Sequence, residues 1–169
     1  MIGAIPRRSL LATSLEATVD IARQLGGQLR GGETIALEGD LGAGKTAFTR
    51  GLCLGVGLND ARIVSSPTYV LEHVYPTRIP VHHYDAYRLA SAAEFAALGG
   101  EERRRAGAIL VIEWAEKVAA VLPADRLIVA FAIPPGESGR NQRFLHFFGP
   151  GDVWGERLLS LIPLPATHP

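Results

Sequence analysis

The stretch Gly39-Asp40-Leu41-Gly42-Ala43-Gly44-Lys45-Thr46 combines glycines, a lysine and a hydroxyl residue at a fixed spacing. The spacing fits the pattern G-x-x-x-x-G-K-[ST], in which glycines let successive main-chain amides converge on a phosphate group. The lysine supplies a compact cation for the outer phosphates, and the hydroxyl is a ligand for Mg²⁺. We therefore expect a nucleoside triphosphate to bind along this loop, at Asp40, Leu41, Gly42, Ala43, Gly44, Lys45, Thr46 and Ala47.

A carboxylate is needed beyond such a loop, to hold the metal's water shell or to orient the attacking water. Glu113 fits this role because it directly follows the apolar run Ala108-Ile109-Leu110-Val111-Ile112. A buried strand that ends in Glu113 must either pair this charge or direct it at a metal, the alternative being an exposed acid at a strand end. The next residue, Trp114, either packs in the core or as a wall of the nucleotide pocket, or contacts a partner or a switch segment.

A second polar cluster is His83-x-Asp85-x-Tyr87-Arg88. In an extended segment, residues 83, 85 and 87 share one face, which would direct an imidazole, a carboxylate and a phenol into one cleft. Asp85 could orient water, bind Mg²⁺ through its water shell, or pair with Arg88. Upstream, Ser65-Ser66-Pro67-Thr68 is either a simple turn or a segment that senses the terminal phosphate through Thr68.

The elements around these residues predict how they are positioned. A helix over about 14–25 precedes a short strand over 33–38, which leads into the loop and then into a helix that continues through Leu54. Segments 63–75 and 81–87 are expected to form a hairpin. The continuous apolar run 108–112 is typical of a central parallel strand that is covered on both faces.

Further elements are a short helix after Ser91, a charged turn or helix over 101–106, a helix over 116–122, a strand over 127–133 that pairs with 143–148 as a hairpin at a sheet edge, and a last helix over 153–162. The run Glu101–Arg105 is either a solvated face or a docking surface. Together these elements predict an α/β fold, a P-loop NTPase-like three-layer sandwich with a mixed, mostly parallel sheet and helices on both faces. We expect a single domain over residues 1–169, with its core at about 10–148 and a tail at 150–169.

Composition narrows the range of partners. The formal net charge is zero, which does not favour direct binding to DNA or RNA. The single cysteine, Cys53, cannot form an internal disulfide, and no apolar stretch approaches the roughly 20 residues of a membrane span. We expect a cytoplasmic protein with no membrane partner. Neither lysine follows an asparagine, so the usual Asn-Lys-x-Asp signal for guanine is absent and ATP is favoured.

Three separated motifs together resemble the TsaE family, small bacterial ATPases once called YjeE. They are the phosphate loop, the stretch Ser66-Pro67-Thr68-Tyr69 with His83-Tyr84-Asp85-Ala86-Tyr87-Arg88-Leu89, and Ile112-Glu113-Trp114. The resemblance covers about residues 10–148. It implies a weak, partner-stimulated ATPase that uses ATP and Mg²⁺ and supports a TsaB–TsaD complex in making threonylcarbamoyladenosine next to the anticodon of tRNA. Contact with the tRNA itself would be only indirect.

The resemblance also implies roles for individual residues. Lys45 would bind phosphate, Thr46 and Glu113 would serve Mg²⁺, Asp85 would be needed for turnover, and Trp114 would belong to the site or couple it to partners. Two positions depart from the family pattern: Ala47 stands where a second threonine is common, and Ala115 where proline is frequent. The first removes a hydroxyl near the α-phosphate, and the second affects mainly the turn.

Two other functions stay open at this point. One is a nucleotide-gated binding module, in which ATP occupancy alone orders segment 65–75 and controls assembly. The other is a small-molecule kinase, in which His83, Asp85 and Arg88 bind an acceptor. A partner-dependent ATPase is preferred because the loop is complete while no arginine finger is evident within the chain.

Overall fold

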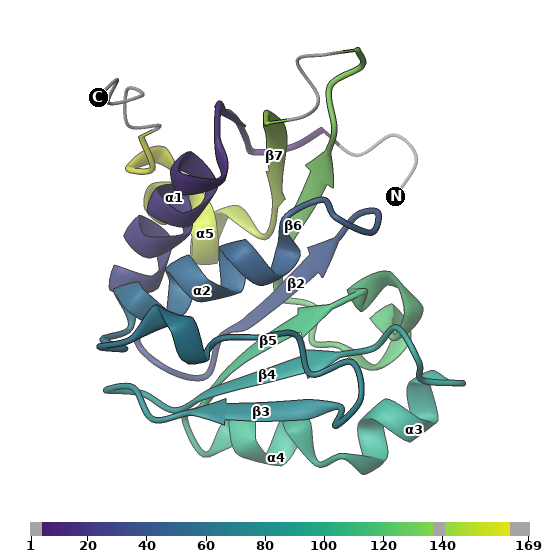
Figure 1. The fold of residues 1–169 in the computed structure, drawn as a ribbon. Coiled ribbons are helices and arrows are strands. Elements are labelled where there is room, and N and C mark those ends of the chain that lie inside the picture. The colour runs from purple at the N-terminus through teal and green to yellow at the C-terminus, as the bar shows by residue number, and fades with distance from the viewer. Residues whose placement is uncertain (1–4, 137–140, 163–169) are drawn as a thin grey trace.

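The computed structural model describes residues 5–136 and 141–162. Within them, one sheet carries helices on both faces (Figure 1). Its strands are β1 (Arg8–Ala12), β2 (Thr34–Glu38), β3 (Glu72–Tyr75), β4 (Val81–Asp85), β5 (Ile109–Glu113), β6 (Leu127–Ala132) and β7 (Arg143–Phe148). The helices are α1 (Leu15–Gly27), α2 (Lys45–Gly55), α3 (Ala92–Ala97), α4 (Gly100–Arg105) and α5 (Gly151–Leu159), and short 3₁₀ turns lie at Ala61–Ile63, Ala115–Lys117 and Ala119–Val121.

The strand order is β1-β7-β6-β2-β5-β4-β3. The central strands β6, β2, β5 and β4 run parallel, whereas the outer pairings of β1 with β7, β7 with β6 and β4 with β3 are antiparallel. The predicted mixed α/β sheet is therefore confirmed, with its parallel part confined to the centre. The predicted hairpin of β6 with β7 also forms, but it does not lie at a sheet edge, because the unpredicted strand β1 pairs along the outer side of β7.

The sheet separates two apolar layers. On one face, α1, α2 and α5 pack against the strands, and on the other face lie α3, α4 and the 3₁₀ turns after β5 (Figure 1). Strand β5 contributes Ile109 and Val111 to the first layer and Leu110 and Ile112 to the second. Each of these side chains is at most 2% exposed, which confirms the strand as one covered on both faces. Glu113 is the last residue of this covered strand.

Helix boundaries follow local capping chemistry. The Ser14 hydroxyl accepts a hydrogen bond from the Ala17 amide at 3.1 Å and so starts α1. The helix predicted over 116–122 is instead two 3₁₀ turns. Val118 between them has φ −121° and ψ 12°, outside the helical range, and therefore interrupts the hydrogen-bond ladder.

No helix in the described part of the chain has the length and apolar character needed to cross a bilayer. The division into a core and a C-terminal tail stays a prediction, and residues 163–169 of that tail lie outside the described residues.

Candidate functional site

The phosphate loop connects the end of β2 to the start of α2, at the carboxyl edge of the parallel strands (Figure 1). Gly44 precedes the helix with φ +107°, a left-handed conformation in which a residue with a side chain would be strained. The first helical amides, those of Lys45, Thr46 and Ala47, have no carbonyl to accept them within the helix. These amides and the positive end of the helix dipole make the loop suitable for an anion.

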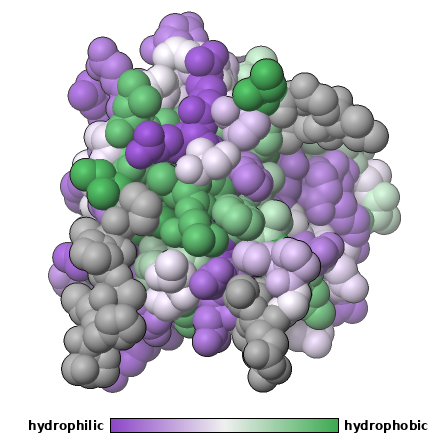
Figure 2. Space-filling model, turned by 90° about the horizontal axis from the view of Figure 1, so that it is seen from above, coloured by the Kyte–Doolittle hydropathy of each residue, from purple (hydrophilic) through white to green (hydrophobic). Residues whose placement is uncertain are grey.

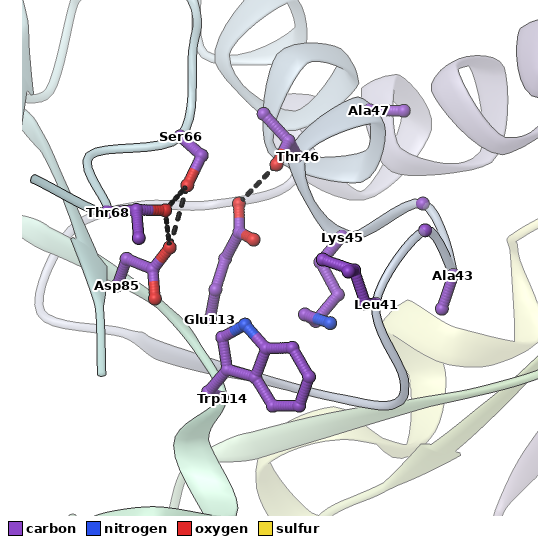
Figure 3. Close-up of a pocket in the computed structure, with 12 residues that line it drawn as sticks. Leu41, Ala43, Lys45, Thr46, Ala47, Ser66, Thr68, Asp85, Glu113 and Trp114 are labelled. Carbon is purple, nitrogen blue, oxygen red and sulfur yellow. Dashed lines mark hydrogen bonds between the residues drawn. The ribbon is translucent and has the colours of Figure 1, made fainter. Parts of the chain in front are cut away.

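A cavity of about 320 Å³ opens beside this loop. Its walls are Leu41, Gly42, Ala43, Gly44, Lys45, Thr46, Ala47, Ser66, Thr68, Asp85, Glu113 and Trp114. Most of the candidates from the sequence thus meet at one place (Figure 3). Asp40 is not part of the cavity wall and contributes its main-chain oxygen to Lys45.

Lys45 is only 5% exposed, and its ammonium group contacts the loop itself. Its Nζ donates to the Gly39 oxygen at 2.6 Å and to the Asp40 oxygen at 2.9 Å, and lies 3.9 Å from the centre of the Trp114 ring. Burial lowers the pKa of Lys45, and the nearby Glu113 carboxylate opposes that shift. The cation is therefore poorly solvated and suited to an anionic ligand.

Glu113 and Thr46 meet across the cavity. The Thr46 hydroxyl donates to Glu113 Oε1 at 2.8 Å, and Glu113 is 3% exposed at the end of β5 (Figure 3). A hydroxyl and a carboxylate are the hard oxygen ligands that Mg²⁺ prefers, and this ion usually keeps several waters or phosphate oxygens besides. The pair fits such an ion. Within the described residues, no group of three or more His, Cys, Asp or Glu side chains is arranged to hold a metal by itself.

Asp85 connects the sheet to the segment before β3. Its Oδ2 accepts the hydroxyls of Ser66 at 2.7 Å and Thr68 at 2.5 Å, and its Oδ1 accepts the Tyr87 amide at 2.8 Å. Parallel pairing sets Asp85 opposite Glu113 at the same edge of the sheet. The proposed pairing of Asp85 with Arg88 is not found, since the Arg88 guanidinium lies over the Tyr69 ring at 5.2 Å.

Trp114 forms one wall of the cavity, which agrees with its interpretation as a wall of the nucleotide pocket. It has φ +58°, rare for a bulky residue, and its ring also packs against Tyr87 at 5.0 Å between centres. The left-handed backbone turns the chain at once after Glu113, which brings the indole over Lys45. Its role toward a partner stays a prediction.

The expected single face of His83, Asp85 and Tyr87 is only partly formed. Strand β4 ends at Asp85, so Tyr87 no longer follows the strand alternation and is 53% exposed. His83 is fully buried and bonds to Glu113 instead of lining the cavity. It is therefore inaccessible to the acceptor of the kinase alternative. Ser66 is a further residue of the site that was not proposed individually; its spacing of two residues from Thr68 was the available signal.

The fold and this cavity define the chain as an α/β protein of the phosphate-binding-loop class. A family model described as "Threonylcarbamoyl adenosine biosynthesis protein TsaE" matches residues 12–142, and the chain belongs to this TsaE family.

Curated relatives named "tRNA threonylcarbamoyladenosine biosynthesis protein TsaE" agree with this assignment. The one from Treponema pallidum is 36% identical over 73% of this chain and 90% of its own length. The one from Streptomyces coelicolor is 33% identical over 85% of this chain and 97% of its own length. The crystal structure of Bacillus subtilis YdiB superposes with a TM-score of 0.75 at 27% identity, covering 91% of this chain and 93% of that one.

Proposed function

We propose that this protein binds ATP with Mg²⁺ and hydrolyses it as an accessory step in forming threonylcarbamoyladenosine next to the anticodon of tRNA. The observation that carries the proposal is the cavity itself, which gathers Lys45, Thr46, Asp85 and Glu113 from a helix and two strands. The relatives' names point to the same modified nucleoside.

Each part of the site has a chemical task in this proposal. Main-chain amides of the loop and the Lys45 ammonium bind the phosphates. Lys45 then donates to phosphate oxygens in place of the main-chain oxygens of Gly39 and Asp40. Mg²⁺, when bound through Thr46 and Glu113, supplies positive charge that offsets the charge developing on the transferred phosphoryl group. Asp85 orients the attacking water, directly or through the metal's water shell, and its contacts with Ser66 and Thr68 bring that segment to the site.

We further propose that the TsaB–TsaD complex is the partner that stimulates hydrolysis. Large apolar side chains stand in solvent beside the site: Leu41, in the cavity wall, is 85% exposed, and Tyr69, next to Thr68, is 87% exposed. Figure 2 shows the molecule from above, with apolar side chains gathered near the middle of that face. Such surfaces suit a protein partner, whereas the zero net charge suits only indirect contact with tRNA.

Partner dependence is tested by comparing the ATPase rate of the purified chain alone with the rate in the presence of TsaB and TsaD. We expect stimulation, because a charge supplied by a partner can raise phosphoryl-transfer rates by about 10³ to 10⁵. Equal rates in both samples would contradict it.

The binding-module alternative gains support from the hydroxyls of Ser66 and Thr68, because they bind a carboxylate that lines the cavity. The variant Glu113→Gln separates the two functions, since it should keep ATP binding and lose hydrolysis. Glu116→Gln, on the exposed turn that follows, is the matched control. If Glu113→Gln still supports repeated cycles of tRNA modification, turnover is unnecessary and the binding-module function is the correct one.

A further inference from the structure

His83 is a buried polar residue that the proposed reaction has not yet used. It lies in the middle of β4, its exposed fraction is 0%, and its neighbours across the sheet are His73 on β3 and Val111 on β5. Its Nε2 is 2.9 Å from Glu113 Oε1, the same oxygen that accepts the Thr46 hydroxyl. Glu113 is thus held from the sheet side by an imidazole and from the helix side by a hydroxyl.

This geometry restricts the proton on the imidazole. A carboxylate can only accept hydrogen bonds, so His83 Nε2 must carry a hydrogen to bond with Glu113. The other ring nitrogen, Nδ1, is 3.4 Å from the Tyr75 hydroxyl, which is also 3.2 Å from the Ser65 oxygen. Burial raises the pKa of Tyr75 to about 12, and the phenol therefore keeps its proton. In a histidine, the group that meets one nitrogen sets the state and orientation of the other.

The contacts form a continuous path. It runs from Glu113 through His83 and Tyr75 to Ser65, which begins the segment whose next residues bind Asp85. In Figure 3 the second oxygen of the Glu113 carboxylate points away from Thr46 and toward the side of the cavity that holds Lys45. Fixing one oxygen with two donors determines where the other one points.

We propose that His83 is a positioning residue, which donates from Nε2 to Glu113 and so holds its free carboxylate oxygen toward the cavity. The proposal rests on the ATPase function, because the orientation matters only if Glu113 acts there. Groups that orient an acidic metal ligand in this way typically change metal affinity or activity by about 10- to 100-fold when they are removed.

The first test needs neither nucleotide nor partner. Long-range proton–nitrogen NMR of the ligand-free chain reports which imidazole nitrogen carries a hydrogen, and the His83 signals are assigned by their loss in His83→Gln. We expect a hydrogen on Nε2. A bare Nε2 would overturn the positioning role and leave the ATPase proposal intact.

The second test uses two variants of similar size. His83→Leu removes the donor, whereas His83→Gln puts an amide nitrogen near the place of Nε2. In the presence of TsaB and TsaD, we expect kcat of His83→Leu to fall about tenfold or more with little change in KM, and His83→Gln to recover most of the loss. Equal loss in both variants, or no loss in His83→Leu, would contradict the proposal.

His82→Gln is the control for damage to β4, because His82 faces the other way and bonds to Glu72 at 2.6 Å. Its kcat should equal that of the unmodified chain. If the unmodified chain itself shows no ATPase activity with its partners, the proposed function fails, while the NMR result on His83 remains interpretable by itself.

Discussion

The ammonium group of Lys45 is stabilised by carbonyl oxygens of its own loop and by the face of an indole ring. These are weaker partners than a phosphate, which brings full negative charges. Because burial already lowers the pKa of Lys45, a bound polyanion would restore the interactions with charge that solvent no longer provides. At the residue scale, the site is therefore arranged for an anion.

Lys45→Ala should weaken ATP binding by about tenfold or more, since hydrogen bonds to charged groups contribute about 1.5–3 kcal/mol. The only other lysine in the sequence, Lys117, offers a matched control. Its ammonium group donates to the Tyr87 oxygen and lies outside the cavity wall, so Lys117→Ala should bind ATP normally. Titration with a fluorescent ATP analogue measures both. Unchanged affinity in Lys45→Ala would rule out the assigned phosphate contact.

At the scale of elements, α2 packs closely against α1 because two of its residues at the contact are glycines, which have no side chain. A Cβ atom on Gly51 would lie 2.1 Å from the Val19 oxygen, and one on Gly55 would lie 2.2 Å from the Arg23 oxygen. The two helices therefore approach backbone to backbone. This contact matters for function because α2 begins with Lys45 and Thr46.

Gly51→Ala should destabilise the fold by about 1–3 kcal/mol, because the new methyl group forces the helices apart. Gly27→Ala is the control: its Cβ would meet nothing within 4 Å, and it should be neutral or stabilise by about 0.4–1 kcal/mol. Urea denaturation of both variants measures the free energy of unfolding. Equal effects of the two substitutions would mean that the close approach of α1 and α2 contributes no energy.

The reactivity of the Cys53 thiol measures whether α2 stays folded and packed against the protein. It is fully buried, and burial raises the pKa of its thiol to about 12. At pH 8 the native protein should react with a thiol reagent only through opening of the helix, whereas the denatured chain should react at once. The thiol of the unfolded chain loses its proton at a lower pH than the buried thiol does. The contribution of Cys53 to the free energy of unfolding should therefore fall as the pH rises from about 9 toward 12. Rapid reaction of the native protein would show that α2 does not pack as described.

At the scale of the whole molecule, much of the fold could be predicted because local patterns specify it. The apolar run ending at Glu113 and the glycine-flanked helix after the phosphate loop are local signals, and both elements form. Strand β1 was missed because Arg8–Ala12 is short, and only pairing with the distant strand β7 makes it a strand. The 3₁₀ turns after β5 were predicted as a helix because helical spacing cannot reveal the non-helical backbone of Val118.

The site was predictable to the same extent. Lys45, Thr46, Asp85 and Glu113 could each be proposed from motif chemistry, and all of them line the cavity. The contact of His83 with Glu113 could not be foreseen, since it depends on the register of β4 against β5. The hydroxyl contacts of Asp85 likewise depend on how a segment 17 or more residues upstream folds back onto the strand.

Calorimetric titration of the purified chain with ATP and Mg²⁺ tests the central claim most directly. We predict saturable heat with one nucleotide bound per chain, and weaker binding when Mg²⁺ is chelated, because Thr46 and Glu113 would then lose their shared ion. If neither ATP nor GTP produces heat with Mg²⁺ present, the cavity beside residues 39–46 is not a nucleotide site and the proposed function is wrong.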